Sequence, residues 1–378
     1  MFGKETKWQM KKIRVLQFPI SANNGVKQYA QINWEFIDKS RFSFDFALVR
    51  DLPAIKSELL ATGAGVEELL ASADSQRDRY VEEAAKMLRG KYDAVHLHTS
   101  FWKRFLIEEI AMECGIPKVI VHSHSAGVDI TDEQTRRKAE ATHRTLREQF
   151  GPSLATHFCA CSQAAADWLF GDRIPKDQIV ILKNAINLEK YLFHRSKREY
   201  IRKQLGLEDS FVVGCVGRMV SMKNHQFLFE VLAEIKHQIP QVKCLLAGEG
   251  PLEHTLRETA QRLHIENDIL FLGQRHDIPD LLQAMDCFCF PSLFEGLGIV
   301  LIEAQASGLP CVVSPAIPDE AFVTPLAQAL PLETGVWAQA LCSIAREQPE
   351  RQNMWEPLTA AGYNIRYQIK EVEKLYEA

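Results

Sequence analysis

Residues 287–314 read CFCFPSLFEGLGIVLIEAQASGLPCVVS. Two short apolar runs, 287–290 and 311–314, enclose a Gly-x-Gly turn at 296–298 and an apolar, helix-like segment after it. A short strand, a glycine turn, a helix and a second short strand in this order are typical of a parallel βαβ unit. The stretch therefore predicts a parallel sheet whose connecting helix begins at a glycine turn.

The same alternation extends through the whole chain. Short runs rich in β-branched and apolar residues alternate with helical stretches on both sides of a polar seam at 184–198. The runs lie at 13–18, 44–49, 94–97, 118–122, 156–161 and 179–182, and then at 211–216, 242–247, 269–272, 287–290 and 311–314. This pattern predicts an α/β protein with two Rossmann-like, doubly wound domains that face each other across a cleft. We expect domains at 1–185 and 186–355, and a C-terminal helix at 356–378 that packs back on the first domain.

Composition excludes several classes of protein. The chain has 378 residues, an apolar content of 46% and a formal net charge of −5, which argues against a general nucleic-acid binder. No run approaches the ~20 apolar residues that cross a bilayer, and the first residues lack a signal-peptide pattern. Nine cysteines without CxxC spacing indicate buried, reduced thiols rather than a metal site. We expect a cytoplasmic protein that has no bound metal and no nucleic-acid partner.

Two carboxylates accompany the Gly-x-Gly turn, Glu295 before it and Glu303 in the apolar segment after it. Gly296 and Gly298, with Leu297 between them, allow backbone N–H groups to approach a ligand, and a helix start favours an anion. On one helix, roughly 100° per residue would leave the two glutamates about 80° apart around the axis. The pattern favours a site for a phosphorylated sugar. The alternative is that Glu295 is an ordinary charge near a helix start and Glu303 a solvated residue.

Basic residues and glycines follow three other strand-like runs of the second half. Open α/β sheets bind ligands at the carboxyl ends of their strands, so two such cations could hold a pyrophosphate and glycine turns could face a nucleobase. Taken singly, the cations are ordinary surface residues and the turns ordinary tight turns. No complete G-x-G-x-x-G or G-x-x-x-x-G-K-[ST] motif is present, which disfavours a nicotinamide dehydrogenase and a P-loop kinase. The residues are Gly217, Arg218 and Lys223 after the first run, Gly248 and Gly250 after the second, and Arg275 after the third.

The first half offers weaker signals. A turn at 21–26, which contains Gly25, follows the first strand-like run, and His122 and His124 end the fourth. A histidine at a strand end is more often structural than catalytic, and His96 and His98 are ambiguous in the same way. The segment 135–147 reads as a basic helix, which is either a solvated face or a surface for anionic lipid.

A family resemblance rests on these motifs together. Glu295-Gly-Leu-Gly298 with Glu303, Gly217-Arg218, Lys223-Asn224, Gly248-Glu-Gly250 and the segment 182–189 resemble the retaining glycosyltransferases of family 4, and most of all their bacterial capsule and exopolysaccharide enzymes. The resemblance covers nearly the whole chain. It implies a GT-B fold, with the nucleotide sugar held mainly by the C-terminal domain and the acceptor by the N-terminal one.

The resemblance also implies roles for single residues. Arg218 and Lys223 would bind the donor diphosphate, Glu303 the ribose, and Glu295 the transferred sugar. His124 or His122 would contact that sugar as well. The remaining implied positions are Gly25 and Gly217 at strand-end turns, Gly296, Leu297 and Gly298 as backbone donors, and Gly248, Gly250 and Arg275 around the base.

The family's reaction implies transfer with retention of configuration, without a metal, from a donor that is most often a UDP-sugar. A lipid-linked or saccharide acceptor and a peripheral position at the inner face of the plasma membrane, through 135–147, are expected on the same ground. The chain departs from the family at Asn24-Gly25, where Gly-Gly is usual, and at Asn184-Ala-Ile186, where Asn-Gly-Ile is usual.

Two alternatives stay open. A sugar-nucleotide epimerase or a phosphorylase could use the same fold, and the epimerase would convert the donor without an acceptor. The second alternative is a catalytically silent binding partner of a polysaccharide assembly complex. The presence of Arg218, Lys223, Glu295 and Glu303 argues against it, because a silent protein has no need to keep all four.

Overall fold

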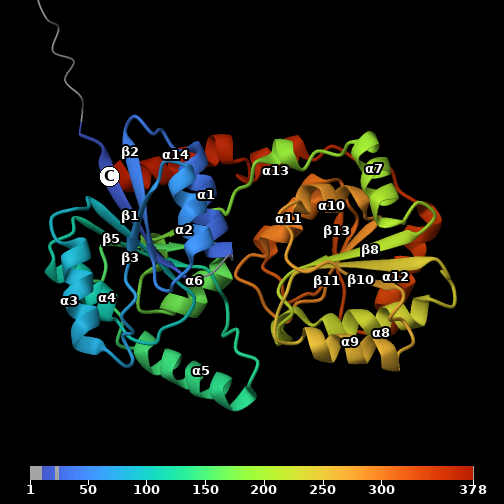
Figure 1. Cartoon of the computed structure of the whole chain (residues 1–378), viewed down its shortest axis with the longest axis horizontal. Helices are drawn as coiled ribbons and strands as arrows, with labels where there is room; N and C mark the ends of the chain where they lie inside the picture. The colour runs from blue at the N-terminus through green and yellow to red at the C-terminus, as the bar shows by residue number, and fades with distance from the viewer. Residues whose placement is uncertain (1–10, 22–24, 378) are drawn as a thin grey trace, which may run out of the picture.

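The structure is a computed structural model that describes residues 11–21 and 25–377. Two parallel sheets form two lobes, and helices cover both faces of each sheet (Figure 1). The first lobe contains β1 Ile13–Ile20, α1 Gly25–Phe36, β2 Phe42–Leu48, α2 Pro53–Ala61, β3 Gly65–Glu68, α3 Arg77–Leu88, β4 Ala94–Thr99, α4 Leu106–Glu113, β5 Lys118–Ser123, α5 Glu133–Arg147, β6 His157–Ala160, α6 Gln163–Phe170 and β7 Ile179–Ile181. The expected α/β class with two Rossmann-like domains is confirmed.

The second lobe repeats the plan. It contains α7 Arg195–Leu205, β8 Phe211–Val216, α8 His225–Ile235, β9 Val242–Ala247, α9 Glu253–Arg262, β10 Ile269–Phe271, α10 Ile278–Ala284, β11 Cys287–Phe290, α11 Ile299–Ala306, β12 Cys311–Val313, β13 Ala327–Ala329 and α12 Thr334–Glu347, followed by α13 Trp355–Ala360 and α14 Ile365–Glu377. Short 3-10 turns lie at Lys176–Gln178, Leu188–Lys190, Ser221–Lys223 and Asp319–Ala321.

Strand order sets the place of a site in each lobe. The sheets run β3-β2-β1-β4-β5-β6-β7 and β10-β9-β8-β11-β12-β13. The order therefore reverses between β1 and β4 and between β8 and β11, and open parallel sheets bind ligands at the carboxyl ends of strands at such points. Most central strands are largely apolar on both faces because helices cover both, as in β8, where Val216 alone is not fully buried.

The segment 356–378 is not a single helix. α13 packs on α11 of the second lobe, whereas α14 crosses to the first lobe and packs on α1 and β1. The apolar stripe of α14 lies in a core shared with β1 and β2, in which Ile369 and Val372 are buried. The first lobe is thus completed by a helix that follows the whole second lobe in sequence (Figure 1).

The chain passes between the lobes twice, and the two passages are bonded to each other. Ile186, on the outward passage, donates its N–H to the carbonyl of Tyr363 at 2.9 Å and accepts from the N–H of Ile365 at 3.1 Å. These bonds form an isolated parallel bridge between Ile186 and Asn364. The lobes are therefore joined by a pair of adjacent segments rather than by a single linker.

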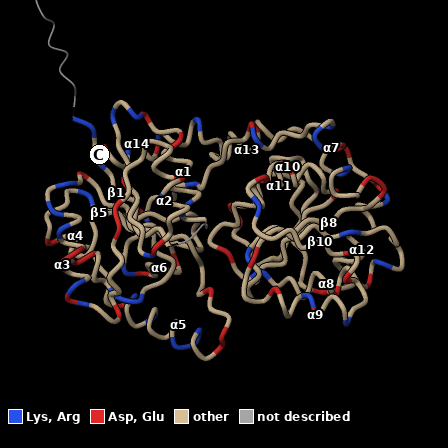
Figure 2. The backbone as a smooth tube through the Cα atoms, in the orientation of Figure 1, with Lys and Arg blue, Asp and Glu red and all other residues tan. Residues whose placement is uncertain are grey.

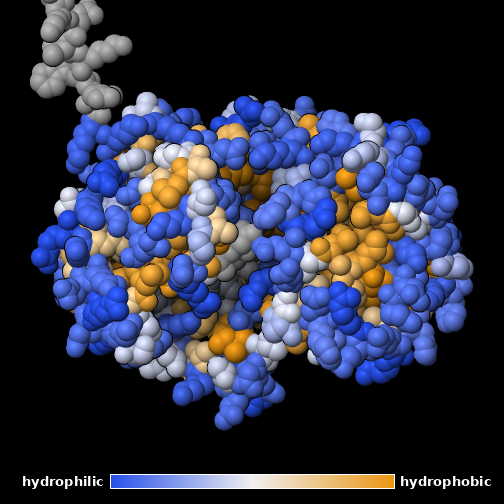
Figure 3. All heavy atoms as spheres, viewed as in Figure 1, coloured by the Kyte–Doolittle hydropathy of each residue, from blue (hydrophilic) through white to orange (hydrophobic). Residues whose placement is uncertain are grey.

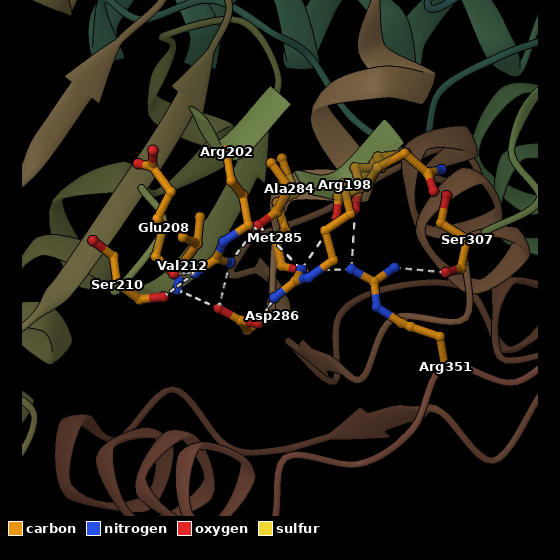
Figure 4. A network of polar contacts seen from close by, with 12 residues as sticks. Arg198, Arg202, Glu208, Ser210, Val212, Ala284, Met285, Asp286, Ser307 and Arg351 are labelled. Carbon is orange, nitrogen blue, oxygen red and sulfur yellow. Dashed lines mark hydrogen bonds and ion pairs between the residues drawn. The ribbon is translucent and has the colours of Figure 1, made fainter. Parts of the chain in front are cut away.

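A cluster of three arginines fixes α7 to the second sheet (Figure 4). Asp286, just before β11, accepts hydrogen bonds from Arg198 and from Arg202, the latter at 3.1 Å, and from the backbone N–H of Val212 at 2.7 Å. Arg351 donates to backbone carbonyls beside them, and burial lowers its pKa to about 9. The carboxylate of Asp286 thus binds two guanidinium groups of α7 and also accepts a hydrogen bond from the backbone of β8.

The surface is mainly hydrophilic, and a furrow separates the two lobes on the face shown in Figure 3. All nine cysteines are free thiols, and eight of them are buried. Among the described residues, no helix combines the length and the apolar character that crossing a bilayer requires.

Candidate active site

The loop after β11 carries Glu295, and the structure corrects its expected relation to Glu303. Helix α11 begins only at Ile299, and its N-cap Gly298 has a left-handed φ of +84°. Glu295 therefore lies in the loop and Glu303 on the helix, so the expected separation around one helix axis is wrong. A Cβ on Gly298 would lie 2.7 Å from the ring of Phe290, which requires glycine here.

Lys223 forms an ion pair with Glu295. Its Nζ lies 2.5 Å from Oε1 of Glu295, and the side chains are only 17% and 10% exposed. The same Nζ lies 5.0 Å from the ring centroid of Phe290, which adds a cation–π contact. Because the pair is shielded from water, its charges act more strongly than surface charges do. An anionic ligand would find here a cation that is already held at the end of β8.

Arg218 extends from the second lobe to the first. It donates from Nη1 to Oδ2 of Asp129 at 2.8 Å, and its side chain is 60% exposed. Asp129 lies in the loop that follows β5. The two cations expected to hold a diphosphate thus both have carboxylate partners in the ligand-free protein, and Arg218 is the more accessible of the two.

Glu303 faces the seam between the lobes. Its Oε1 accepts a hydrogen bond from the hydroxyl of Tyr191 at 2.7 Å. Burial raises the pKa of Glu303 to about 7, although the Tyr191 bond acts in the opposite direction. Glu303 is therefore a partly buried acceptor whose charge changes near neutral pH.

Glycines bring the turns after β8 and β9 together. Gly248 has φ +140°, and a Cβ on it would lie 2.0 Å from the carbonyl oxygen of Gly217. A Cβ on Gly250 would lie 2.4 Å from the carbonyl oxygen of Met219. The exposed Arg275 is held by Asp277, with N–O distances of 2.8 and 2.5 Å. These positions lie at one edge of the sheet, and the glycines are needed for loop packing whether or not a base lies there.

The two lobes touch at Gly296. A Cβ on Gly296 would lie 2.1 Å from the carbonyl oxygen of His124, and the hydroxyl of Ser162 at the start of α6 donates to the carbonyl of Gly296. Gly127 similarly approaches the ring of Phe294. The loop of Glu295 is therefore seated directly on the loop that follows β5, with the buried Leu297 behind it.

The structure distinguishes His124 from His122. His122 is fully buried, whereas His124 is partly exposed at the end of β5. His122 belongs to a group with His96 and His98 whose ligand-capable atoms lie within 4.8 Å of one another, a grouping that the sequence analysis did not foresee. The backbone carbonyl of His124 lies at the contact between the lobes, and its ring is the partly exposed one of the two.

A cavity of about 410 Å³ opens beside Glu295. It is lined from the first lobe by Ala126 and the start of α6, and from the second by the segment 316–320. Three further carboxylates, from Asp167, Asp319 and Glu320, lie on its wall. Acidic walls of this kind suit a hydroxyl-rich group better than an anion.

Gly25 and the segment 135–147, which the sequence also singled out, are not among the residues described above around Glu295. Gly25 is the exposed first residue of α1, and positions 22–24 of the turn that contains it lie outside the described residues. The basic segment 135–147 is part of α5, capped by Asp132, which accepts from the N–H of Thr135. Positive residues recur along this helix at the lower edge of the first lobe (Figure 2).

Sequence reasoning missed three contributors. Tyr191, Asp129 and Ser162 hold Glu303, Arg218 and the Gly296 carbonyl respectively. Ser162 had a signal, because serine before a helical run is typical of an N-cap and it accepts from the N–H of Ala165. Tyr191 and Asp129 had none, since only tertiary folding brings them to their partners.

Comparison with known proteins finds matches along most of the chain. Residues 197–340 match the family described as glycosyl transferases group 1, and residues 47–185 match the glycosyl transferase 4-like domain. The "Putative glycosyltransferase EpsF" of Bacillus subtilis (strain 168) is 31% identical over 375 residues, which is 96% of each chain. The Escherichia coli UDP-Gal:alpha-D-GlcNAc-diphosphoundecaprenol alpha-1,3-galactosyltransferase is 32% identical over 59% of this chain and 58% of its own.

Solved structures share the fold. The structure of Anabaena Alr3699/HepE in complex with UDP and glucose superposes with a TM-score of 0.77 at 22% identity, over 96% of this chain and 100% of that one. WaaG, described as a glycosyltransferase involved in lipopolysaccharide biosynthesis, superposes with a TM-score of 0.67 at 15% identity, over 97% and 98% of the two chains.

Proposed function

Because the chain belongs to the GT-B glycosyltransferases of family 4, we propose that it transfers a sugar, with retention, from a UDP-sugar to a lipid-linked or saccharide acceptor in exopolysaccharide or capsule assembly. The observation that carries the proposal is the shielded Lys223–Glu295 pair at the end of the second sheet, 2.5 Å apart and close to the loop of His124. A cation and a carboxylate are thereby held beside the loop that carries the histidine.

In this proposal the donor replaces the present ion-pair partners. Lys223 leaves Glu295 and Arg218 leaves Asp129, and both cations then bind oxygens of the donor diphosphate. Glu303 accepts hydrogen bonds from the ribose hydroxyls. Glu295, released from Lys223, accepts a hydrogen bond from a hydroxyl of the sugar. His124 approaches the sugar from the other lobe.

The transfer then follows from charge placement. The bond between the anomeric carbon and the diphosphate oxygen breaks, and the two cations stabilise the negative charge that develops on the diphosphate. The acceptor hydroxyl attacks on the same face, and its proton passes to the departing phosphate oxygen. Arg218 and Lys223 supply the charge compensation that a metal would otherwise give, so we propose metal-independent transfer.

The donor and acceptor classes rest on the relatives. The HepE structure contains UDP, and the E. coli relative is named for a UDP-sugar and a diphosphoundecaprenol acceptor. The acidic cavity beside Glu295 supports a hydroxyl-rich acceptor group. We propose that the acceptor lies between α6 and the segment 316–320.

Peripheral membrane binding through α5 belongs to the same proposal. Arg144 and Arg147 lie in its last turn, although Arg137 and Arg136 pair with Glu133 and Glu140. The test is cosedimentation with vesicles of anionic lipid at low and high salt, with neutral vesicles as control. Binding that is equal for both lipid types, or absent at low salt, would remove this part of the proposal.

The test of the donor site is thermal unfolding with UDP, GDP, ADP, TDP and CMP in the presence of chelator. A ligand that binds only the native state raises the melting temperature, so selective stabilisation by UDP is expected. Lys223→Met should lose this shift, whereas Lys203→Met, at an exposed position of α7, should keep it. Equal shifts in both variants would refute the assignment of Lys223.

Turnover assays on the wild-type protein then distinguish the alternative functions. Incubation with UDP-sugars and a diphosphate-linked lipid acceptor should yield an α-linked product from an α-linked donor. Conversion of the donor without any acceptor would indicate an epimerase. Nucleotide binding without turnover in any combination would favour the silent binding partner.

A further inference from the structure

Four histidines lie on one face of the first sheet. His96 and His98 are two residues apart on β4, His122 and His124 are two apart across the end of β5, and the register of these strands places His98 beside His122. The ring centroids of His96 and His98 are 4.6 Å apart, and those of His122 and His124 are 4.0 Å apart. Of the four, only His124 is more than slightly exposed.

One buried amide joins these rings to the last helix. Gln17, on β1, is 1% exposed, and its Oε1 lies 2.9 Å from Nε2 of His98. Its Nε2 donates to the hydroxyl oxygen of Tyr376 on α14 at 3.0 Å. Gln17 therefore stands between two chains of hydrogen bonds.

The first chain leads to His124. An amide oxygen can only accept, so His98 carries its proton on Nε2. Its Nδ1 is then a lone pair, which lies 2.9 Å from Nε2 of His124 and accepts from it. Since burial lowers the pKa of His124 to about 3, this ring is neutral and its Nδ1 holds a lone pair. No other described group bonds to that atom.

The second chain runs away from the cleft. Tyr376, which accepts from Gln17, donates its own proton to Nδ1 of His96 at 2.7 Å. His96 then donates from Nε2 to Nδ1 of His122 at 3.0 Å. The chain ends at Nε2 of His122, which is buried without a partner among the described residues. Rotating the amide of Gln17 by half a turn would reverse the protons of both chains.

We propose that Gln17, acting through His98, holds His124 in the Nε2–H tautomer, so that Nδ1 of His124 is available to accept a hydrogen bond from a hydroxyl of the transferred sugar. This inference rests on the proposed function, which places that sugar at His124. Gln17 and His98 are positioning residues. A reversed amide would make Nδ1 of His124 a donor and would leave the hydroxyl without its acceptor.

The same rings could instead bind a metal ion, since atoms of His96, His98 and His122 lie within 4.8 Å of one another. Ligation through Nε2 of His96 would move its proton to Nδ1. The Tyr376 hydroxyl would then have to accept from both His96 and Gln17, and its own proton would lose its acceptor. The proton arrangement with all inner bonds satisfied is the metal-free one.

The direct test is ¹⁵N NMR of the histidine rings in the ligand-free protein, which reads the tautomer without any turnover. Protonated Nε2 and unprotonated Nδ1 are expected for all four rings. Gln17→Met should let His98 and His124 exchange between tautomers. Gln17→Glu should restore them, because a carboxylate also accepts from His98. Tyr376→Phe is the matched control, since it removes the partner of Nε2 of Gln17 and the chain to His96 but leaves the bond between Oε1 of Gln17 and His98.

The kinetic test asks whether the tautomer matters for transfer. Gln17→Met should lower kcat about tenfold with a donor KM within about threefold of wild type, as expected for one misdirected hydrogen bond. Gln17→Glu should recover most of the rate, and Tyr376→Phe should retain it. A protonated Nδ1 on His124 of the wild type, or an unchanged kcat in folded Gln17→Met, would overturn the proposal.

Two further results distinguish failure of the proposed function from failure of this inference. Absence of any sugar transfer by the wild type would refute the proposed function while the NMR tautomers remain readable. Stoichiometric binding of Zn²⁺ to the wild type that is lost in His96→Leu would replace the hydrogen-bond arrangement with a metal site, and would overturn the inference.

Discussion

Replacing Glu303 by glutamine is expected to stabilise the ligand-free protein above pH 7 and to weaken its binding of a nucleoside diphosphate. Glu303 is partly buried on α11, and burial raises its pKa from 4.5 to about 7. A raised pKa means that the folded protein favours the protonated carboxyl. The stabilising contribution is therefore complete below pH 4.5 and is lost as the pH rises through about 7.

The size of the effect follows from the shift. A rise of the Glu303 pKa from 4.5 to about 7 corresponds to about 3 kcal/mol, and solvent screening of a partly exposed group reduces this to about 1–2 kcal/mol. Glutamine is neutral at every pH and can still accept from Tyr191. The variant should thus match the wild type at pH 5 and melt higher by about 2–4 °C at pH 8.5.

Ligand binding should change in the opposite sense. A charged carboxylate binds a pair of hydroxyls more strongly than an amide does, so the affinity for UDP at pH 8 should fall about tenfold in Glu303→Gln. Wild-type affinity should itself weaken from pH 8 to pH 6 as Glu303 becomes protonated.

The assay is thermal unfolding of both proteins from pH 5 to pH 8.5, followed by calorimetric titration with UDP at pH 6 and pH 8. Glu266→Gln, at an exposed site of the second lobe, is the control for loss of one charge. A melting-temperature difference between Glu303→Gln and wild type that does not vary with pH would refute the raised pKa. An unchanged UDP affinity would separately remove the ribose assignment.

Three other changes test the contact between the lobes, the anchoring of α7 and the donor site. Gly296→Ala places a methyl group 2.1 Å from the carbonyl of His124, so it should part the lobes and abolish transfer while each lobe still folds, as measured by small-angle scattering and circular dichroism. Asp286→Ala leaves two guanidinium groups without their carboxylate and should cost about 3–5 kcal/mol in denaturant unfolding; a loss below 1 kcal/mol would contradict this account of α7. Asp129→Asn frees Arg218 from a competing carboxylate, so UDP should bind a few-fold more tightly, and weaker binding would show that Asp129 assists the donor instead.

The fold was predictable because its strands are buried and therefore apolar. Prediction failed at one edge of each sheet: β3 Gly65–Glu68 and β13 Ala327–Ala329 carry small or polar residues, which give no apolar run, whereas the opposite edges β7 and β10 are apolar and were predicted. The glycines and charges of the second lobe were recognisable because they follow strands. The position of Glu295 was not, since the left-handed Gly298 delays the start of α11.

The partners of the site residues were the least predictable part. Tyr191 contacts Glu303 across 112 positions of the chain, and Tyr376 contacts Gln17 across 359. Neither tyrosine lies in a pattern that marks it as polar and paired. Sequence periodicity reports which face of an element is buried, but not which distant group that face meets.

The return of α14 to the first lobe has a consequence for biosynthesis. A ribosome releases the strands of the first lobe well before it synthesises Ile369, Val372 and Tyr376, which complete the packing over β1 and β2. During that interval the entire second lobe is translated, and the apolar groove that α14 will fill faces water or a chaperone. The first lobe to emerge is thus the last to be finished, and nascent chains stalled within the second lobe should expose this groove.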